Sequence, residues 1–134
     1  MTIIGFSYTK IHVERKKMMK GSINIRNHAQ VKNLETVDIS LGPKKQALKF
    51  SFTFTTEYKP DLAEILLEGE IISLETEERA KEMLKIWKKD KKLPDQMITP
   101  ILNDILNKCS IQALILSREL NLPAPIQLPK VAAK

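Results

Sequence analysis

The residues of this chain that could do chemistry are two histidines, one cysteine and a pair of glutamates. His12 lies among alternating apolar and polar residues, which predicts the polar side of a strand, and His28 lies near a turn. Neither has a cysteine or carboxylate at metal-ligand spacing, so we expect structural histidines and no metal. Cys109 falls on the apolar side of a predicted helix, where a small buried side chain is the usual role. Glu68 and Glu70 share a strand face, but nothing places a nucleophile or acid beside them, which favours a solvated edge.

The glycines are too dispersed to form a phosphate-binding loop, since they stand at positions 5, 21, 42 and 69. The sequence therefore offers no catalytic or cofactor-binding set of residues. We predict that the chain is not an enzyme and that it uses no cofactor. What remains informative is how its strands and helices present apolar surface.

The first half of the chain has the period-two pattern of strands. In "ALKFSFTFTTEY" (47–58), Phe52 and Phe54 share one face while serines and threonines point to the other. Gly69 indicates a bulge or a close approach of backbone. No helical segment intervenes, so we expect an antiparallel sheet of four strands, or five if the weak segment 22–28 counts, with one covered face. The expected strands are 5–15, 22–28, 34–41, 47–58 and 63–74.

The second half has helical periodicity. Thr76 is a suitable N-cap for a helix over 76–90, whose first turn carries two glutamates. Pro94 ends it, and a longer helix is predicted over 99–119 with Pro100 in its first turn. The buried stripe of this longer helix is predicted to be Leu102, Ile105, Leu106, Cys109, Ala113 and Leu116.

These elements predict an α+β fold in which two C-terminal helices cover one face of the sheet. The 134 residues suit a single domain, 1–134, with strands at about 3–74, helices at about 76–90 and 99–119, and an extended segment at 120–134. No apolar run approaches the ~20 residues of a membrane span, and the N-terminus lacks a signal-peptide layout. With one cysteine, which cannot form an internal disulfide, we expect a cytoplasmic protein.

Two isoleucines of the longer helix fall on its polar side. At about 100° per residue, Ile111 and Ile115 lie close to Asp104 and Lys108 around the helix. A helix that only covers its own sheet needs no apolar residues there, so we predict a second contact surface for a subunit partner or a client chain. The alternative is that they are exposed aliphatic residues of the ordinary kind.

The segment "LNLPAPIQLPKV" (120–131) carries three prolines, which exclude a helix, yet leucine and isoleucine still recur through it. This pattern indicates an extended segment that docks onto the rest of the chain. Two outcomes stay open: the segment walls a binding groove, or it only completes the core.

The formal charge of +6 raises the alternative of nucleic-acid binding. The lysines gather in "ERKKMMK" (14–20), "GPKK" (42–45) and "KIWKKDKK" (85–92), where acidic residues interrupt two of the three runs. A solvated, lysine-rich surface is the favoured interpretation, and such surfaces also occur in proteins of hot environments.

Two stretches carry a resemblance to a known family. "FSYTKIHVE" (6–14) resembles the first strand of the SecB-type export chaperones, which begins with a similar Tyr-Thr-Lys followed by alternating apolar residues. "ITPILNDILNKCSIQALILSRELNLPAPIQL" (98–128) resembles that family's long C-terminal helix, with a proline in the opening turn, a cysteine within the helix and a Leu-Asn-Leu-plus-proline segment after it. The order of strands followed by two helices also agrees.

The resemblance implies a four-stranded antiparallel sheet with two helices, assembled into a homo-oligomer (a dimer or a tetramer) through strand and helix contacts. It also implies a passive, ATP-independent chaperone that holds unfolded or nascent polypeptides in apolar grooves. The residues expected to bind polypeptide or contact another subunit are Phe6, Tyr8, Phe52, Phe54, Ile111, Ile115, Leu120, Leu122, Ile126 and Leu128.

The chain also departs from the family. The bacterial chaperones are acidic, and their acidic surface helps to engage the translocation motor, whereas this chain is basic and has no acidic tail before Lys134. We therefore expect this chain to share the family's holdase activity more readily than its export partner. A role like that of SecB-like relatives that guard toxin–antitoxin pairs is another possibility. A nucleic-acid-binding module and a structural subunit of a larger complex remain the alternatives. The first would need exposed aromatic residues beside the basic groups.

Overall fold

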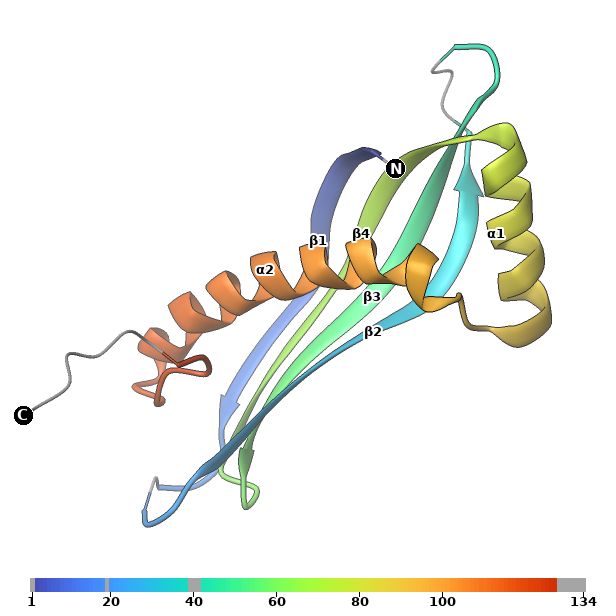
Figure 1. The fold of residues 1–134 in the computed structure, drawn as a ribbon. Coiled ribbons are helices and arrows are strands. Elements are labelled where there is room, and N and C mark those ends of the chain that lie inside the picture. The colour runs from blue at the N-terminus through green and yellow to red at the C-terminus, as the bar shows by residue number, and fades with distance from the viewer. Residues whose placement is uncertain (1, 19, 39–41, 128–134) are drawn as a thin grey trace, which may run out of the picture.

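A four-stranded antiparallel sheet is followed by two helices (Figure 1), which confirms the predicted α+β fold. The computed structural model describes residues 2–18, 20–38 and 42–127. The strand order is β1-β4-β3-β2, so β1 and β2 form the two edges. The elements are β1 (Thr2–Arg15), β2 (Asn24–Val37), β3 (Lys45–Lys59), β4 (Ala63–Thr76), α1 (Glu77–Asp90) and α2 (Asp95–Glu119).

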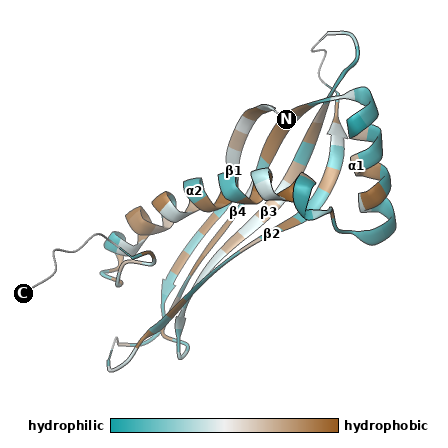
Figure 2. Cartoon of the chain, viewed as in Figure 1, coloured by the Kyte–Doolittle hydropathy of each residue, from teal (hydrophilic) through white to brown (hydrophobic). Residues whose placement is uncertain are grey.

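Both helices lie on the same side of the sheet, which we call the covered face; the opposite side is the open face. In Figure 1, α2 crosses in front of the strands, while α1 stands at one end of the sheet beside β2. The strands alternate in hydropathy along their length (Figure 2), as a sheet with one covered face requires. The buried side chains that β3 sends to the covered face are Leu48, Phe50, Phe52, Phe54, Thr56 and Tyr58.

The buried side of α2 advances in steps of four residues rather than along the predicted stripe. Leu106 was expected in the core but is 38% exposed, and Leu102 and Leu116 are only partly buried. Because the sheet is twisted, the line of contact moves around the helix as it crosses the strands. The residues buried along this line are Met97, Ile101, Ile105, Cys109, Ala113 and Ser117.

The structure corrects two strand predictions. The segments 22–28 and 34–41 belong to one strand, β2, and the part 39–41 lies outside the described residues. The register of β2 against β3 shifts between Val31 and Asn33, so a bulge at Lys32 interrupts the alternation that strand prediction depends on. No fifth strand forms among the described residues. Glu68 and Glu70, expected at an edge, lie in the central strand β4.

The start of α2 is also corrected, whereas that of α1 is confirmed. Thr76 caps α1 by accepting a hydrogen bond from the Arg79 N–H at 3.3 Å. α2 begins at Asp95, four residues before the predicted 99, with Pro94 at its N-cap position. Pro100 therefore lies in the second turn, where its missing N–H removes a single backbone hydrogen bond.

Gly69 makes room for an aromatic ring in the middle of the covered face. It pairs directly with Tyr8 of β1 on one side and with Phe52 of β3 on the other. A Cβ atom at this position would lie 2.6 Å from Cζ of Phe52 and would clash with the backbone oxygen of Ser7. The predicted close approach is confirmed: the ring of Phe52 occupies the space that a side chain would need.

The segment after α2 turns back across the end of the sheet. Asn121 has a φ of 53°, and the Leu122 N–H donates to the Ser117 oxygen at 2.8 Å, which reverses the chain. Three strands then supply side-chain donors to its backbone. Arg15 of β1, Tyr58 of β3 and Asn27 of β2 donate to the carbonyl oxygens of Leu120, Pro123 and Pro125, at 3.2, 2.6 and 2.8 Å.

The Gly69→Ala substitution should destabilise the fold strongly, because the added methyl group must displace the ring of Phe52. Overpacking of this kind costs about 1–3 kcal/mol of unfolding free energy, which denaturant titration would measure. Gly5→Ala is the matched control, since a Cβ there meets nothing closer than 3.3 Å at Ile72. Equal stability losses in the two variants would contradict the account of Gly69.

The Tyr58→Phe substitution should lower the unfolding free energy by about 1–2 kcal/mol, because it leaves the carbonyl of Pro123 without its donor. Tyr8→Phe is the control, since the Tyr8 hydroxyl makes a long 3.4 Å bond to the Lys108 oxygen and makes none to the described part of the segment after α2. Limited proteolysis should then cut the segment after α2 faster in Tyr58→Phe than in Tyr8→Phe. The same cleavage rate in both variants would argue against this anchoring.

Candidate functional site

Three aromatic side chains from β1 and β3 cluster under α2. The ring centroid of Phe6 lies 5.2 Å from that of Tyr8, edge to face, and 5.2 Å from that of Phe52. The ammonium of Lys108, on α2, sits 4.6 Å from the centre of the Phe6 ring, which is a cation–π distance. This cluster therefore fixes the middle of α2 against the edge strand β1.

Burial disfavours the charged forms of two side chains in this region, Cys109 and Tyr8. Burial raises the pKa of the Cys109 thiol to about 11; the nearby Asp104 charge acts in the same direction, and a hydrogen bond with Tyr8 opposes it. Burial also raises the pKa of Tyr8, with a smaller contribution from Cys109. Cys109 is thus protonated at neutral pH, and its thiol is fully buried, as expected for a small core side chain rather than a nucleophile.

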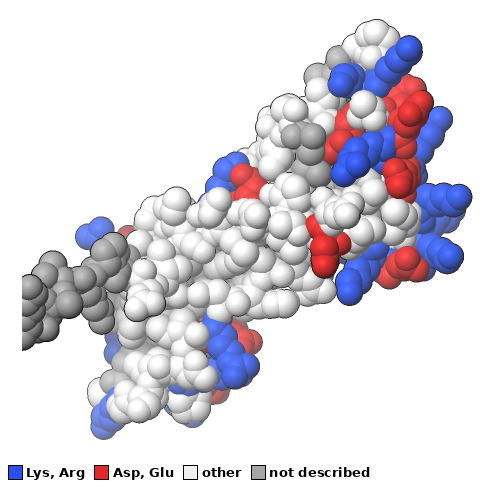
Figure 3. Space-filling view, in the orientation of Figure 1, with Lys and Arg blue, Asp and Glu red and all other residues white. Residues whose placement is uncertain are grey.

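The side of α2 that points away from the sheet carries exposed apolar surface. Ile111 and Ile115 are 60% and 50% exposed, one helical turn apart, and we call them the outer α2 patch. Figure 3 shows a broad uncharged band across the middle of this side of the molecule, while the charges concentrate around α1. The predicted placement of both isoleucines on the outward side of the helix is confirmed.

The edge strand β1 adds apolar surface that sequence reasoning missed. Ile11 faces the covered side but is 49% exposed. On the same face, Tyr8 before Ile11 and Arg15 beyond it reach α2 or its end through hydrogen bonds to the backbone oxygens of Lys108 and Leu120. Ile11 therefore lies beside the second half of α2 and extends the apolar surface towards the sheet edge. Ile11 is exposed because β1 is an edge strand. The alternation of apolar and polar residues in the sequence does not show which strand lies at an edge.

The remaining predicted contact residues differ in how deeply they are buried. Phe52 and Phe54 are 2% and 0% exposed and form the core under α2, and Leu122 is 7% exposed. Leu120 and Ile126 are partly buried, and Leu128 lies outside the described residues. Leu122 thus helps to complete the core, and a binding role for these residues stays a prediction.

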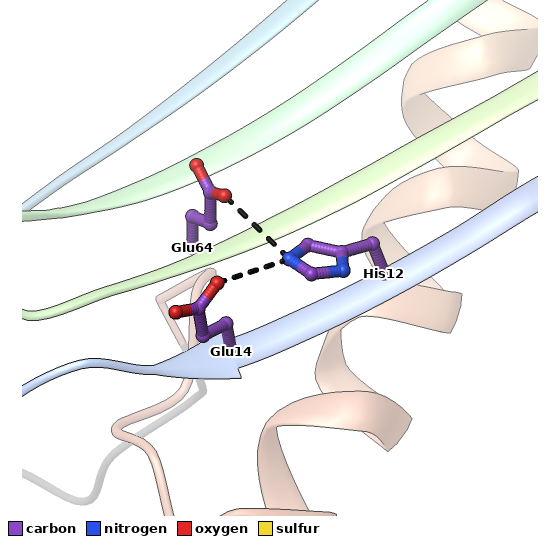
Figure 4. A group of neighbouring side chains, drawn as sticks. All are labelled: His12, Glu14 and Glu64. Carbon is purple, nitrogen blue, oxygen red and sulfur yellow. Dashed lines mark hydrogen bonds and ion pairs between the residues drawn. The ribbon is translucent and has the colours of Figure 1, made fainter.

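One group of side chains on the open face corrects the expectation for histidine. His12 was expected to have no carboxylate at metal-ligand spacing, yet Glu14 and Glu64 both approach it (Figure 4). Glu64 comes from β4, more than fifty positions away, so no spacing along the sequence could show it. Among the described residues this is also the single group of three potential metal ligands.

Both tyrosines should resist ionisation while the chain is folded. Burial raises the pKa of Tyr58 to about 12 from the ordinary 10.0, and it raises that of Tyr8 as well. Because the folded state favours the neutral phenol, this contribution to stability is complete below pH 10 and is lost as the pH rises through about 12. Tyrosinate absorbance should therefore appear together with the loss of the circular dichroism signal. If the tyrosines ionised near pH 10 while the fold stayed intact, this prediction would be wrong.

Among the described residues, neither helix combines the length and the apolar composition that crossing a membrane requires. No protein-family model and no curated protein matches the chain. Among solved structures, the chain is similar to a SecB-like chaperone of Mycobacterium tuberculosis, Rv1957, in complex with a ChAD peptide from the antitoxin HigA1 (Rv1956). The similarity covers 99% of this chain and 91% of that one, with a TM-score of 0.57 and 10% sequence identity. At that identity the comparison establishes a shared SecB-like fold.

Proposed function

We propose that this chain is a passive, ATP-independent holdase that binds unfolded or nascent polypeptides. The observation that carries the proposal is the outer α2 patch: Ile111 and Ile115 remain 60% and 50% exposed on a helix whose other side already covers the sheet. The fold shared with a chaperone whose structure was solved in complex with a peptide supports the same function. The proposal includes no catalytic step, no cofactor and no translocation motor.

Apolar burial would supply the affinity. Burying apolar surface is worth about 25 cal/mol per Å² before the entropic losses of association, and it needs no particular client sequence. Ile111, Ile115 and Ile11 present this surface on two neighbouring elements. The partly buried Leu120 and Ile126 of the docked segment would wall the groove, and Leu122 would support them from the core. A surface of this composition suits a range of unfolded chains rather than one partner.

The same surface could instead join copies of the chain. Aliphatic residues exposed on a helix are as suitable for a subunit contact as for a client, and a homo-oligomer, a dimer or a tetramer, is part of the proposal. In that arrangement clients would bind in grooves between subunits. A purely structural subunit of a larger complex would use the patch for its partner alone and would bind no unfolded chain.

Nucleic-acid binding is the less supported function. Proteins that bind single strands present aromatic rings for stacking beside basic groups. Phe6 and Tyr8 are partly buried under α2, and Trp87 is 7% exposed in the core. The lysines on α1 are exposed but share the helix surface with Glu78 and Glu82. Among the described residues, the lysines of α1 therefore have no exposed aromatic ring beside them.

The double substitution Ile111→Ser and Ile115→Ser tests the proposal. The wild-type chain should suppress the aggregation of an unrelated reduced protein, and its affinity should survive high salt because apolar burial drives it. The double variant should bind the unfolded protein at least about tenfold more weakly, the equivalent of about 1.4 kcal/mol. Met18→Ser is the control, since Met18 is 67% exposed but lies in the loop after β1.

Sedimentation of the same samples separates the two roles of the patch. Loss of client binding with an unchanged oligomer assigns the patch to clients, whereas loss of both assigns it to assembly. A wild-type chain that suppresses no aggregation, but binds a single-stranded oligonucleotide with steep salt dependence, would overturn the proposal.

A further inference from the structure

A histidine and two glutamates converge on the open face, at the edge of the sheet away from the helices. His12 and Glu14 point to this face from β1, two residues apart, and Glu64 points to it from β4 (Figure 4). The His12 Nε2 atom lies 3.3 Å from Oε2 of Glu14 and 3.6 Å from Oε1 of Glu64. The three side chains remain 41%, 50% and 36% exposed, so a dissolved ion can reach them.

The two glutamates oppose each other in the sheet. Glu14 pairs directly with Glu64, and Glu64 pairs on its other side with Glu57 of β3, so three carboxylates stand in one row across three strands. Like charges directly opposite each other destabilise a strand pair. Glu57 is 3.3 Å from the ammonium of Lys59, whereas Glu14 and Glu64 have His12 as their ion-pair partner among the described residues.

Lys16, which follows Glu14 closely in the sequence, is paired with another carboxylate. The ammonium of Lys16 lies 3.1 Å from Asp61, and the pKa of Lys16 is raised mainly by that hydrogen bond, with only minor contributions from Glu64 and Glu14. A cation placed between the two glutamates would therefore relieve a repulsion that no lysine of the described chain neutralises directly.

One nitrogen atom faces both carboxylates. A single N–H at Nε2 of His12 has one proton for two acceptors, so a hydrogen bond cannot satisfy Glu14 and Glu64 equally. With Nε2 deprotonated, its lone pair and the two carboxylate oxygens are three electron-pair donors that lie within 4.8 Å of one another. Donor atoms this close together can bind one metal ion.

Two of the three distances between the donor atoms match those around a tetrahedral ion. Zinc bonds of about 2.0–2.2 Å to nitrogen and oxygen place neighbouring ligand atoms about 3.3–3.6 Å apart in a tetrahedron. The two measured separations are 3.3 and 3.6 Å, and all three donor atoms lie within 4.8 Å of one another. An imidazole among the ligands favours Zn²⁺-like cations over Ca²⁺ or Mg²⁺, which prefer oxygen alone.

We propose that His12, Glu14 and Glu64 form a binding site for Zn²⁺ on the open face, with the fourth position left to water. The ion would join the edge strand β1 to the central strand β4 through side chains, in addition to their backbone pairing. This site is separate from the outer α2 patch, which lies on the other side of the sheet, and it does not depend on the proposed chaperone function.

Metal titration of the untagged, chelator-treated full chain tests the site. Calorimetry should show one Zn²⁺ per chain, and Co²⁺ should give the intense visible absorption of a four-coordinate site. The isosteric Glu64→Gln and the His12→Gln substitutions should each weaken Zn²⁺ binding at least about tenfold, since even residues behind the ligands have effects of that size. Both variants should fold, because the three side chains are solvent-exposed.

Two matched variants control for general loss of histidine or charge. His28→Gln removes the other histidine, on the open face of β2, and Glu68→Gln removes a glutamate from the same face of β4. Neither control substitution should change the affinity for Zn²⁺ by more than about twofold. The proposal is overturned if the wild-type chain shows no saturable Zn²⁺ binding, or if His12→Gln and Glu64→Gln bind Zn²⁺ as tightly as these controls.

Discussion

The burial of the β3 aromatic residues beneath α2 is the interaction on which the rest of the structure depends. Phe50, Phe52 and Phe54 are at most 2% exposed, and each fully buried side chain of this size contributes about 1.5–3 kcal/mol to folding. A four-stranded sheet with one apolar face needs a cover of this kind. The glycine of β4 at position 69 leaves the space that the Phe52 ring occupies on that face. The sheet and α2 therefore form one core.

Among residues 2–18, 20–38 and 42–127, this arrangement leaves Ile111 and Ile115 exposed on the outward side of α2. The segment after α2 could have folded back along the helix, but it crosses the end of the sheet instead. Its prolines prevent a helix, so its carbonyl oxygens need other donors, and Arg15, Tyr58 and Asn27 supply them from three strands. The segment thereby becomes part of the core through Leu122, while Ile111 and Ile115 remain exposed.

The open face of the sheet carries charged side chains instead of a core. Cross-strand pairing brings together carboxylates that are far apart in the sequence, and exposure to water makes their repulsion tolerable. Lys49 neutralises part of this face by contacting Glu35 and Glu70 at 2.8 and 3.1 Å. Around His12 no such lysine contact exists among the described residues, so the imidazole stands between Glu14 and Glu64. The side of the sheet that bears the helices thus presents apolar surface, and the open face presents charged groups.

The sequence by itself determined the fold class, the N-cap of α1 and the exposure of Ile111 and Ile115, because period and capping are local properties of the chain. It also indicated the close approach at Gly69. Only the tertiary structure decided the pairing order that puts β1 at an edge and β4 in the centre, and hence the exposure of Ile11 and the meeting of Glu64 with His12. The local patterns gave wrong predictions for β2, because of its bulge, and for Leu106, because of the sheet twist. A bulge and the twist both depend on neighbouring strands. Contacts between distant segments arise from strand pairing, which spacing along one chain does not encode.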